Sequence, residues 1–139
     1  MIFTSVDIRV RYSETDAMGI SYHANYLSWF EVARTDLLAK IGVSYRKLDD
    51  EGFLLPVLEA QMRFISPSRY DDLLHVIAKI NEEPRVRIRI DYEVYLQDRL
   101  ITTGHTLHAF MNRAGQAVKP PITVRDAFAA AFPPPALPQ

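Results

Sequence analysis

Apolar and polar residues alternate at the start of the chain and again across its second half. In FTSVDIRVRY, residues 3–12, one side carries Val6, Ile8, Val10 and Tyr12, while charged residues occupy the other. This period of two predicts a half-buried strand. Turn-like sequences separate four later segments that are also expected to be strands: residues 54–67, 72–80, 86–97 and 100–112. Because short turns join these four strands, antiparallel pairing is favoured.

A helical spacing replaces the alternation over residues 25–41, NYLSWFEVARTDLLAKI. Its apolar side chains fall on one side of a helix: Tyr26, Trp29, Phe30, Ala33, Leu37 and Ile41. Gly42 follows where a helix commonly ends. Shorter helices are expected at 44–51 and 122–132, and nothing in the tail PPPALPQ, residues 133–139, calls for order. The order of elements predicts an α+β fold, in which one long helix covers an antiparallel sheet of about five strands.

Composition narrows the possible functions. The 139 residues suit a single domain covering residues 1–139. The absence of cysteine excludes disulfides, thiolate metal sites and cysteine nucleophiles, and it suits a reducing compartment. A net charge of −1 gives no overall attraction to nucleic acid or to an anionic membrane. No apolar run reaches membrane-spanning length and no signal peptide is visible. We therefore expect a cytoplasmic protein with no nucleic-acid partner and no membrane insertion.

Several familiar kinds of site are missing from the sequence. There is no G-x-S-x-G nucleophile motif, no P-loop and no G-x-G-x-x-G turn. His105 and His108 are three residues apart in a predicted strand, so their side chains point to opposite faces and cannot hold one ion together. No metal site and no cofactor is expected.

Arginines recur in the strand expected at residues 86–97 and just before it. Arg85, Arg87 and Arg89 fall on one face, opposite the apolar residues between them. Charge on an exposed strand is ordinary, so a solvated sheet face is one interpretation. The other is a phosphate-binding stripe, because guanidinium groups pair well with phosphate. Both interpretations stay open.

Arg34 is the one charged residue within the apolar arc of the long helix. A charge in that position must extend to water or find a partner. Glu31, on the neighbouring turn, and Glu59, in a predicted strand, are the candidate carboxylates. We expect a structural ion pair and not a catalytic one.

The loop SETDAMGISYHANY, residues 13–26, places Asp16 directly before the long helix. Aspartates are common in turns, so this position alone does not indicate a function. The first amides of the helix, near Tyr22, His23 and Ala24, are expected to lack intrahelical partners. Such amides can polarise a carbonyl oxygen. A carboxylate beside them would form a minimal site for acyl hydrolysis, in which it activates water or attacks the carbonyl itself.

The same region carries a family resemblance. The stretch RYSETDAMGISYHANYLSWFEVARTDLL, residues 11–38, resembles the 4-hydroxybenzoyl-CoA thioesterase family, and within it the acyl-CoA thioesterases of the Tol-Pal-associated branch. Its motif is D-x-x-G-x-x-Y-H-x-N-Y. The later stretch LEAQMRFISPSRYDDLLHV, residues 58–76, resembles the next block of the family, so the likeness covers most of residues 7–112.

The resemblance implies a hotdog fold, an antiparallel sheet wrapped around one long helix. It implies that Asp16 is the catalytic carboxylate and that the backbone amide of His23 helps to bind the thioester carbonyl. The His23 side chain either assists catalysis or simply packs, and the polar loop around it favours assistance. Tyr22 and Asn25 of the same motif are assigned to substrate binding. It further implies an acyl-CoA substrate whose coenzyme A lies in a groove between subunits, hence a homodimer or a homotetramer.

Several alternatives remain. A non-catalytic hotdog module could bind acyl groups or a protein partner, but it would have no need for Asp16. A hotdog dehydratase would require a different arrangement of histidine and acid, which is not found here. Acyl-carrier protein could replace coenzyme A as the donor, since the phosphopantetheine arm is the same. Acyl length, aromatic or aliphatic preference, and the role of Asp16 as base or nucleophile stay open.

Overall fold

The computed structural model describes residues 1–138, and its elements follow the predicted order. The strands are β1 (Ile2–Arg9), β2 (Phe53–Leu54), β3 (Val57–Phe64), β4 (Leu73–Ile80), β5 (Arg87–Leu96), β6 (Arg99–Ala109) and β7 (Met111–Asn112). The helices are α1 (Asn25–Lys40), α2 (Tyr45–Asp50) and α3 (Ile122–Ala131), with a short 3₁₀ turn at Tyr12–Glu14. None of the helices in this part of the chain is long and apolar enough to cross a membrane.

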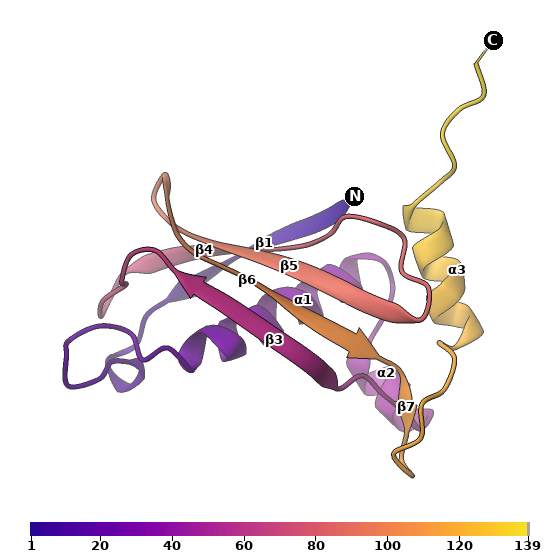
Figure 1. The fold of residues 1–139 in the computed structure, drawn as a ribbon, viewed down its shortest axis with the longest axis horizontal. Helices are drawn as coiled ribbons and strands as arrows, with labels where there is room; N and C mark the ends of the chain where they lie inside the picture. Colours follow the sequence, from indigo (N-terminus) through magenta and orange to yellow (C-terminus); the bar gives the residue numbers. More distant parts are fainter. Residues whose placement is uncertain (139) are drawn as a thin grey trace.

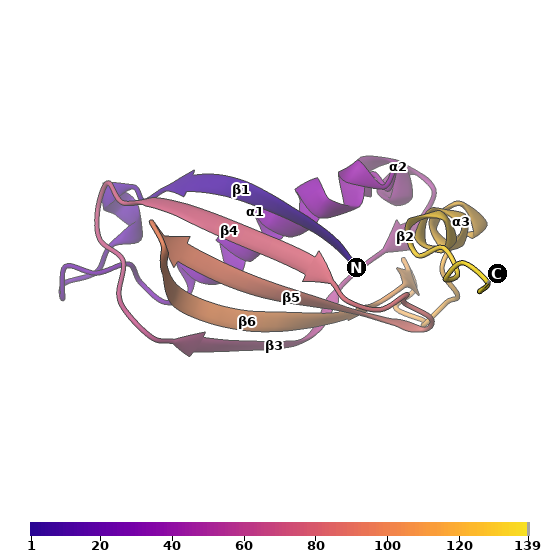
Figure 2. The same cartoon turned by 90° about the horizontal axis from the view of Figure 1, so that it is seen from above.

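Five strands form one antiparallel sheet in the order β1-β4-β5-β6-β3 (Figure 1). Seen from above, the sheet curves around α1 (Figure 2). This is the hotdog arrangement expected from the sequence. Strands β1 and β3 are the two edges of the sheet. The loop that leads from β1 into α1 lies at one end of the molecule (Figure 1).

Some predicted boundaries were wrong. The strand expected at 54–67 is split into β2 and β3 by Leu55-Pro56, because proline has no backbone N–H to donate to a ladder. Strand β1 ends at Arg9, so Tyr12 does not continue its buried face and is 78% exposed. Residues 133–138 of the tail form no helix or strand, and Gln139 lies outside the described residues.

The core packs α1 against the middle of the sheet. The predicted apolar face of the helix is confirmed, with Phe30, Ala33 and Leu37 fully covered. Phe30 stacks on Tyr92 of β5 with ring centroids 4.2 Å apart and planes 5° from parallel. Gly104 of β6 makes this approach possible, because a Cβ there would lie 2.9 Å from the Phe30 ring and 2.6 Å from the Gln61 carbonyl oxygen.

The buried charge on α1 does not have the carboxylate partner that we expected. Arg34 is only 7% exposed, and it lies within ion-pairing distance of no Asp or Glu in residues 1–138. Its guanidinium donates instead to the hydroxyls of Tyr92, at 3.0 Å, and Tyr45, at 3.2 Å. Burial raises the pKa of both phenols, so they stay neutral and hydrogen-bond Arg34 without supplying an opposite charge.

His108 of β6 belongs to the same polar cluster. Its Nε2 lies 2.8 Å from the Thr106 hydroxyl, which in turn lies 2.7 Å from the Tyr92 hydroxyl. Burial, reinforced by the nearby charge of Arg34, lowers the pKa of His108 to about 4. The folded protein therefore holds this imidazole neutral well below the pH at which an exposed histidine becomes charged.

We predict that the protein loses stability in mild acid through His108. Between about pH 6.5 and pH 4 the unfolded chain binds a proton that the folded chain does not, so the free energy of unfolding falls as the pH drops. The full difference amounts to about 3 kcal/mol once the pH is below 4. Urea denaturation at several pH values measures the slope.

His108→Gln should flatten the dependence of the unfolding free energy on pH, whatever stability the variant loses at neutral pH. His75→Gln is the matched control, because His75 is a partly exposed histidine on the other face of the sheet, where it pairs with Asp7. An unchanged slope in His108→Gln would show that other groups cause the acid sensitivity.

Candidate active site

The loop between β1 and α1 holds Asp16 in a small turn of its own. The Asp16 amide donates to the Ile20 carbonyl at 3.0 Å, and the Gly19 amide donates to the Asp16 carbonyl at 2.9 Å. Gly19 takes the positive φ of +78° that this turn requires, a conformation that glycine adopts without strain. One carboxylate oxygen of Asp16, Oδ1, accepts from the Met18 amide at 2.9 Å. The other, Oδ2, accepts no hydrogen bond within residues 1–138, so it is free to act on a substrate.

The start of α1 leaves two amides without acceptors. The N–H groups of Asn25 and Tyr26 already donate to the carbonyls of Tyr22 and His23. Within residues 1–138, the N–H groups of His23 and Ala24 find no acceptor. Tyr22 differs from our expectation, because its amide donates to the Glu14 carbonyl at 2.8 Å. The amides available at the helix mouth are therefore those of His23 and Ala24, at the positive end of the helix dipole.

Asp16 and His23 line the same pocket, of about 350 Å³, at this end of the molecule. Its other walls are mainly apolar: Met18, Ile20, Ser21, Tyr26, Phe64, Ile65, Ser66 and Pro67. The His23 ring packs edge-on to Phe64, with centroids 6.4 Å apart. Phe64 and Ile65 remain 48% and 54% exposed, so the side of the pocket next to β3 is uncovered.

Glu14 connects this loop to α1 through hydrogen bonds. It was not among the residues predicted from the sequence. Its carboxylate is only 7% exposed and accepts from the Trp29 indole of α1 at 2.9 Å and from the Arg11 amide at 2.8 Å. Burial alone would raise the pKa of Glu14, but these hydrogen bonds and the Arg11 guanidinium outweigh it and hold the pKa below its usual value. Asn25 donates its side-chain amide to the Glu14 carbonyl at 2.7 Å, so that amide is engaged in the loop.

The far wall of the pocket is fastened in a similar way. The Ser68 hydroxyl lies 2.7 Å from the Ser21 hydroxyl and 2.8 Å from that of Tyr26, and all three are buried. The Ser21 amide also donates to the Ser68 carbonyl at 2.8 Å. The loop is thus joined to α1 and to the segment after β3. Tyr22 lies just outside the pocket, with its exposed ring 4.4 Å from that of His23.

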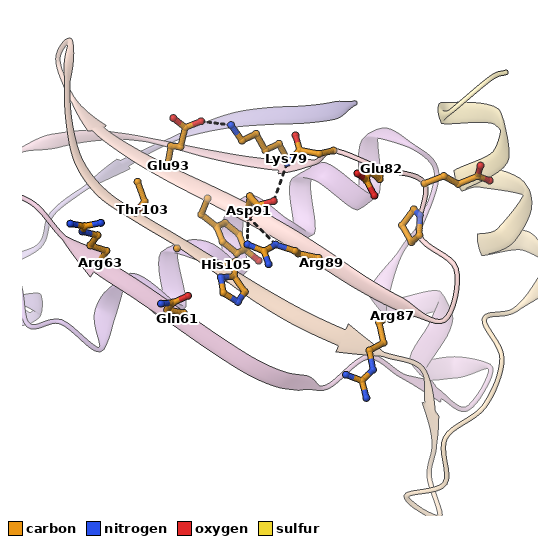
Figure 3. Close-up of a pocket in the computed structure, with 15 residues that line it drawn as sticks. Gln61, Arg63, Lys79, Glu82, Arg87, Arg89, Asp91, Glu93, Thr103 and His105 are labelled. Carbon is orange, nitrogen blue, oxygen red and sulfur yellow. Dashed lines mark hydrogen bonds and ion pairs between the residues drawn. The ribbon is translucent and has the colours of Figure 1, made fainter. Parts of the chain in front are cut away.

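Arg87 and Arg89 line a second hollow, of about 860 Å³, on the outer face of the sheet (Figure 3). Arg89 pairs with Asp91 at 3.2 Å, and Lys79 pairs with Glu93 at 2.7 Å. Arg87 has no carboxylate within 4 Å among the described residues. The hollow therefore offers free cationic side chains beside pairs that already neutralise one another.

Two further arginines complete the description of this hollow. Arg63 of β3 lines it and is also without a carboxylate partner in residues 1–138, although Arg63 was not among the residues predicted from the sequence. Arg85 precedes β5 and lies in the connection after β4, so it does not share the regular alternation of Arg87 and Arg89. It is not among the residues that line either hollow.

Arg87 lies far from the Asp16 pocket on one chain, although the outer hollow extends along β3 as far as Arg63, next to Phe64. Along β6, Phe64 of the first pocket pairs with Thr102, whereas Arg87 pairs with Ala109. These seven residues correspond to about 23 Å along the strand. The pocket of Asp16 opens on the side of the sheet that faces α1, and the arginines lie on the opposite face.

Comparison with known proteins agrees with this geometry. The Thioesterase-like superfamily matches residues 10–132. YneP of Bacillus subtilis is 38% identical over 64% of both chains. The acyl-CoA thioester hydrolase YbgC of Escherichia coli O6:H1 is 36% identical over 52% of this chain. The matches span 64% of YneP and 54% of YbgC, which is less than two thirds of either relative.

Solved structures give the same result over nearly the whole chain. The DHNA-CoA thioesterase of Staphylococcus aureus superposes with a TM-score of 0.89 at 29% identity, covering 94% of this chain and 91% of that one. The 4-hydroxybenzoyl-CoA thioesterase of Pseudomonas sp. strain CBS-3, at 19% identity and a TM-score of 0.81, supports the fold alone. The chain therefore belongs to the thioesterase-like superfamily, as a hotdog-fold member of a family of thioester hydrolases.

Proposed function

We propose that the protein is an acyl-CoA thioesterase that hydrolyses its substrate to a free acid and coenzyme A at the Asp16 pocket. One observation carries the proposal. Asp16 and His23, at the start of α1, line one pocket, and within residues 1–138 Asp16 Oδ2 accepts no hydrogen bond and the amides of His23 and its neighbour Ala24 have no acceptor. The carbonyl oxygen of a bound thioester would accept from these amides, and Asp16 would act on the carbonyl carbon or on a water beside it.

The chemistry of the leaving group suits so small a site. A thioester expels a thiolate, and the conjugate acid of that thiolate has a pKa of about 8.5 by analogy with cysteine. Such a group leaves without a general acid, unlike the amine of an amide. Activation of the attack and stabilisation of the oxyanion are then the two tasks that the protein must perform.

Two routes satisfy the geometry. Asp16 can take a proton from water as that water attacks the carbonyl, or it can attack directly and form a mixed anhydride that water then hydrolyses. The His23 ring lines the pocket without a hydrogen bond to residues 1–138, which leaves it available to the substrate. Tyr22 extends the aromatic surface beside it, whereas Asn25 contributes by holding the loop.

The outer hollow is our candidate for the phosphates of coenzyme A. Arg87, which has no carboxylate partner among the described residues, is the best placed cation, and Arg63 lies in the same hollow. Arg89 already pairs with Asp91, so it would bind a phosphate in competition with that carboxylate. Arg85, in the preceding connection, could reach a nucleotide only at the rim.

A second copy of the chain would shorten the distance along the sheet between the Asp16 pocket of one chain and the β5 arginines of the other, which stay on the outer face of the joined sheet. Strand β3 is an edge strand with an exposed apolar rim that includes Val57, Leu58 and Phe64, and such edges pair readily with another strand. If β3 pairs antiparallel with its own copy, the Phe64 end of one chain lies beside the Val57 end of the other. From Val57, the β5 arginines of that same copy are two strand spacings away, about 10 Å.

This arrangement supports a homodimer, or a tetramer built from dimers, with the substrate between subunits. It would also cover the exposed side of the pocket at Phe64 and Ile65. The apolar lining suits an uncharged acyl group. The motif of residues 16–26 favours the Tol-Pal-associated branch, and the relative YbgC is named an acyl-CoA thioester hydrolase. Turnover of short, long and aromatic acyl-CoAs, compared directly, would define the preference.

Asp16→Asn should lower kcat by at least about a hundredfold, because asparagine can neither take a proton from water nor attack a carbonyl. KM should change little, since coenzyme A is bound elsewhere. If the amides of His23 and Ala24 stabilise the oxyanion, the variant should still hydrolyse the substrate faster than the uncatalysed reaction. Steady-state kinetics with an acyl-CoA substrate measures both constants.

Asp98→Asn is the matched control, because Asp98 is an exposed aspartate in the β5–β6 turn that lines neither hollow. His23→Ala keeps the backbone amide and should therefore retain more activity than Asp16→Asn. Near-normal turnover in folded Asp16→Asn would overturn the catalytic assignment and favour a non-catalytic acyl-binding module.

Arg87→Gln should raise KM for acyl-CoA by about ten- to a hundredfold, as expected for the loss of one charge-assisted hydrogen bond to a phosphate. KM for the corresponding acyl-pantetheine, which lacks the nucleotide phosphates, should stay the same. Arg99→Gln, an exposed arginine at the opposite end of β6, serves as control. An equal effect on both substrates would assign Arg87 to ordinary surface charge.

Two lysines on the β3 edge, Val57→Lys with Leu58→Lys, should convert the assembly into folded monomers with little activity, because like charges would face one another across the interface. Phe3→Lys on the opposite edge strand, β1, should leave assembly and turnover unchanged. Sedimentation velocity and kinetics on the same samples test both. A fully active wild-type monomer at low concentration would contradict the shared site.

A further inference from the structure

We infer that Glu14 is a positioning residue that sets the place of the Asp16 carboxylate relative to the helix mouth. The inference rests on the proposed function, in which Asp16 acts on the thioester. Glu14 itself does not line the pocket, and both of its carboxylate oxygens are engaged. It would act through its neighbour and not on the substrate.

The first step of the argument is the unusual burial of the Glu14 carboxylate. A carboxylate in a loop would ordinarily remain in water, and burying one is costly unless donors replace the lost hydration. Here Oε2 accepts from the Trp29 indole, and Oε1 accepts from the Arg11 amide, with the Arg11 guanidinium 3.3 Å away. The contacts join the beginning of the loop to the second turn of α1.

The second step concerns the backbone of the same residue. The Glu14 carbonyl accepts from the Tyr22 amide at 2.8 Å and from the Asn25 side chain at 2.7 Å. Glu14 therefore holds both ends of the loop: the strand side through Arg11 and the helix side through Tyr22 and Asn25. The same contact engages the Tyr22 amide, so within residues 1–138 the amides of His23 and Ala24 are the ones left without an acceptor at the start of α1.

The third step is that Asp16 has no such fastening of its own. Within residues 1–138, its side chain hydrogen-bonds only to the Met18 amide and its backbone only to Gly19 and Ile20, all within the loop. Hydrogen bonds to the rest of the fold anchor the loop at Glu14 on one side and at Ser21 on the other. A shift of about 1 Å in reacting groups can cost about a hundredfold in rate. The distance between Asp16 and the helix amides thus depends on Glu14.

Glu14→Gln tests this dependence, because its size is kept while one of the two oxygens is replaced by an NH₂ group that cannot accept from Trp29 or Arg11. We expect kcat to fall about ten- to a hundredfold with KM changed less than about twofold. Trp29→Phe, which removes only the indole donor, should lower kcat in the same direction by a smaller factor. Glu31→Gln, an exposed carboxylate on the same helix, should leave both constants unchanged.

A double variant separates positioning from a general structural role. In an Asp16→Asn background, adding Glu14→Gln should change the residual kcat by less than about twofold, because the group that Glu14 positions is already gone. Emission from Trp29, the only tryptophan, checks that the folded contact is altered only locally. If Glu14→Gln does not fold, the same cycle is run with Trp29→Phe.

The outcomes are distinct for the two proposals. If Asp16→Asn abolishes turnover while folded Glu14→Gln keeps its kcat, the positioning role is overturned and the thioesterase site stands. If the two losses multiply in the double variant, Glu14 acts on the helix mouth independently of Asp16, which also overturns the inference. If Asp16→Asn turns over normally, the proposed site fails first and the positioning role fails with it.

Discussion

The contact between Phe30 and the sheet determines where the N-terminal end of α1 lies. Phe30 stacks on Tyr92 and occupies the space that Gly104 leaves open, so no larger residue at position 104 would permit the same depth of packing. The helix begins five residues earlier, at Asn25, about 7.5 Å along its axis. A helix seated by a core contact this close to its start cannot move its first amides independently of the sheet, which gives the pocket a rigid base.

Two buried charged residues of this region, Arg34 and Glu14, are stabilised mainly by hydrogen bonds with uncharged groups. Arg34 donates to two tyrosine hydroxyls, and Glu14 accepts from an indole and a backbone amide, with the Arg11 guanidinium as its one ion-pair partner within residues 1–138. A buried polar group without a hydrogen-bond partner lowers the free energy of unfolding, so each of these hydrogen bonds favours one rotation of α1 about its axis. The apolar face sets the depth of the helix, and these polar contacts set its orientation.

The sequence predicted the order of strands and helices well, because the spacing of apolar residues and the residues that form turns are local properties. The order of strands and helices, the buried face of α1 and the placement of Asp16 ahead of the helix all followed from patterns within about twenty residues. What the sequence could not supply depends on distant partners. Arg34 found tyrosines instead of a carboxylate, because Tyr92 arrives from a strand 58 residues away. Glu14 and Asp16 are both acidic residues of one loop, and nothing local shows which is buried by Trp29 and which faces the pocket.

The sparseness of the pocket follows from the reaction that we propose for it. A thiolate leaves without protonation, so a single carboxylate and two amides are enough for the chemistry, and the remaining requirement is to place the carbonyl between them. One chain encloses the pocket on only one side, because Phe64 and Ile65 stay exposed along the β3 edge. The same edge strand has backbone groups free for pairing, so the surface that completes the pocket and the surface that would join two chains coincide. In such a design, assembly and catalysis are coupled by geometry, because the dry, closed environment that strengthens the amides' hydrogen bonds forms only when a second strand covers the edge.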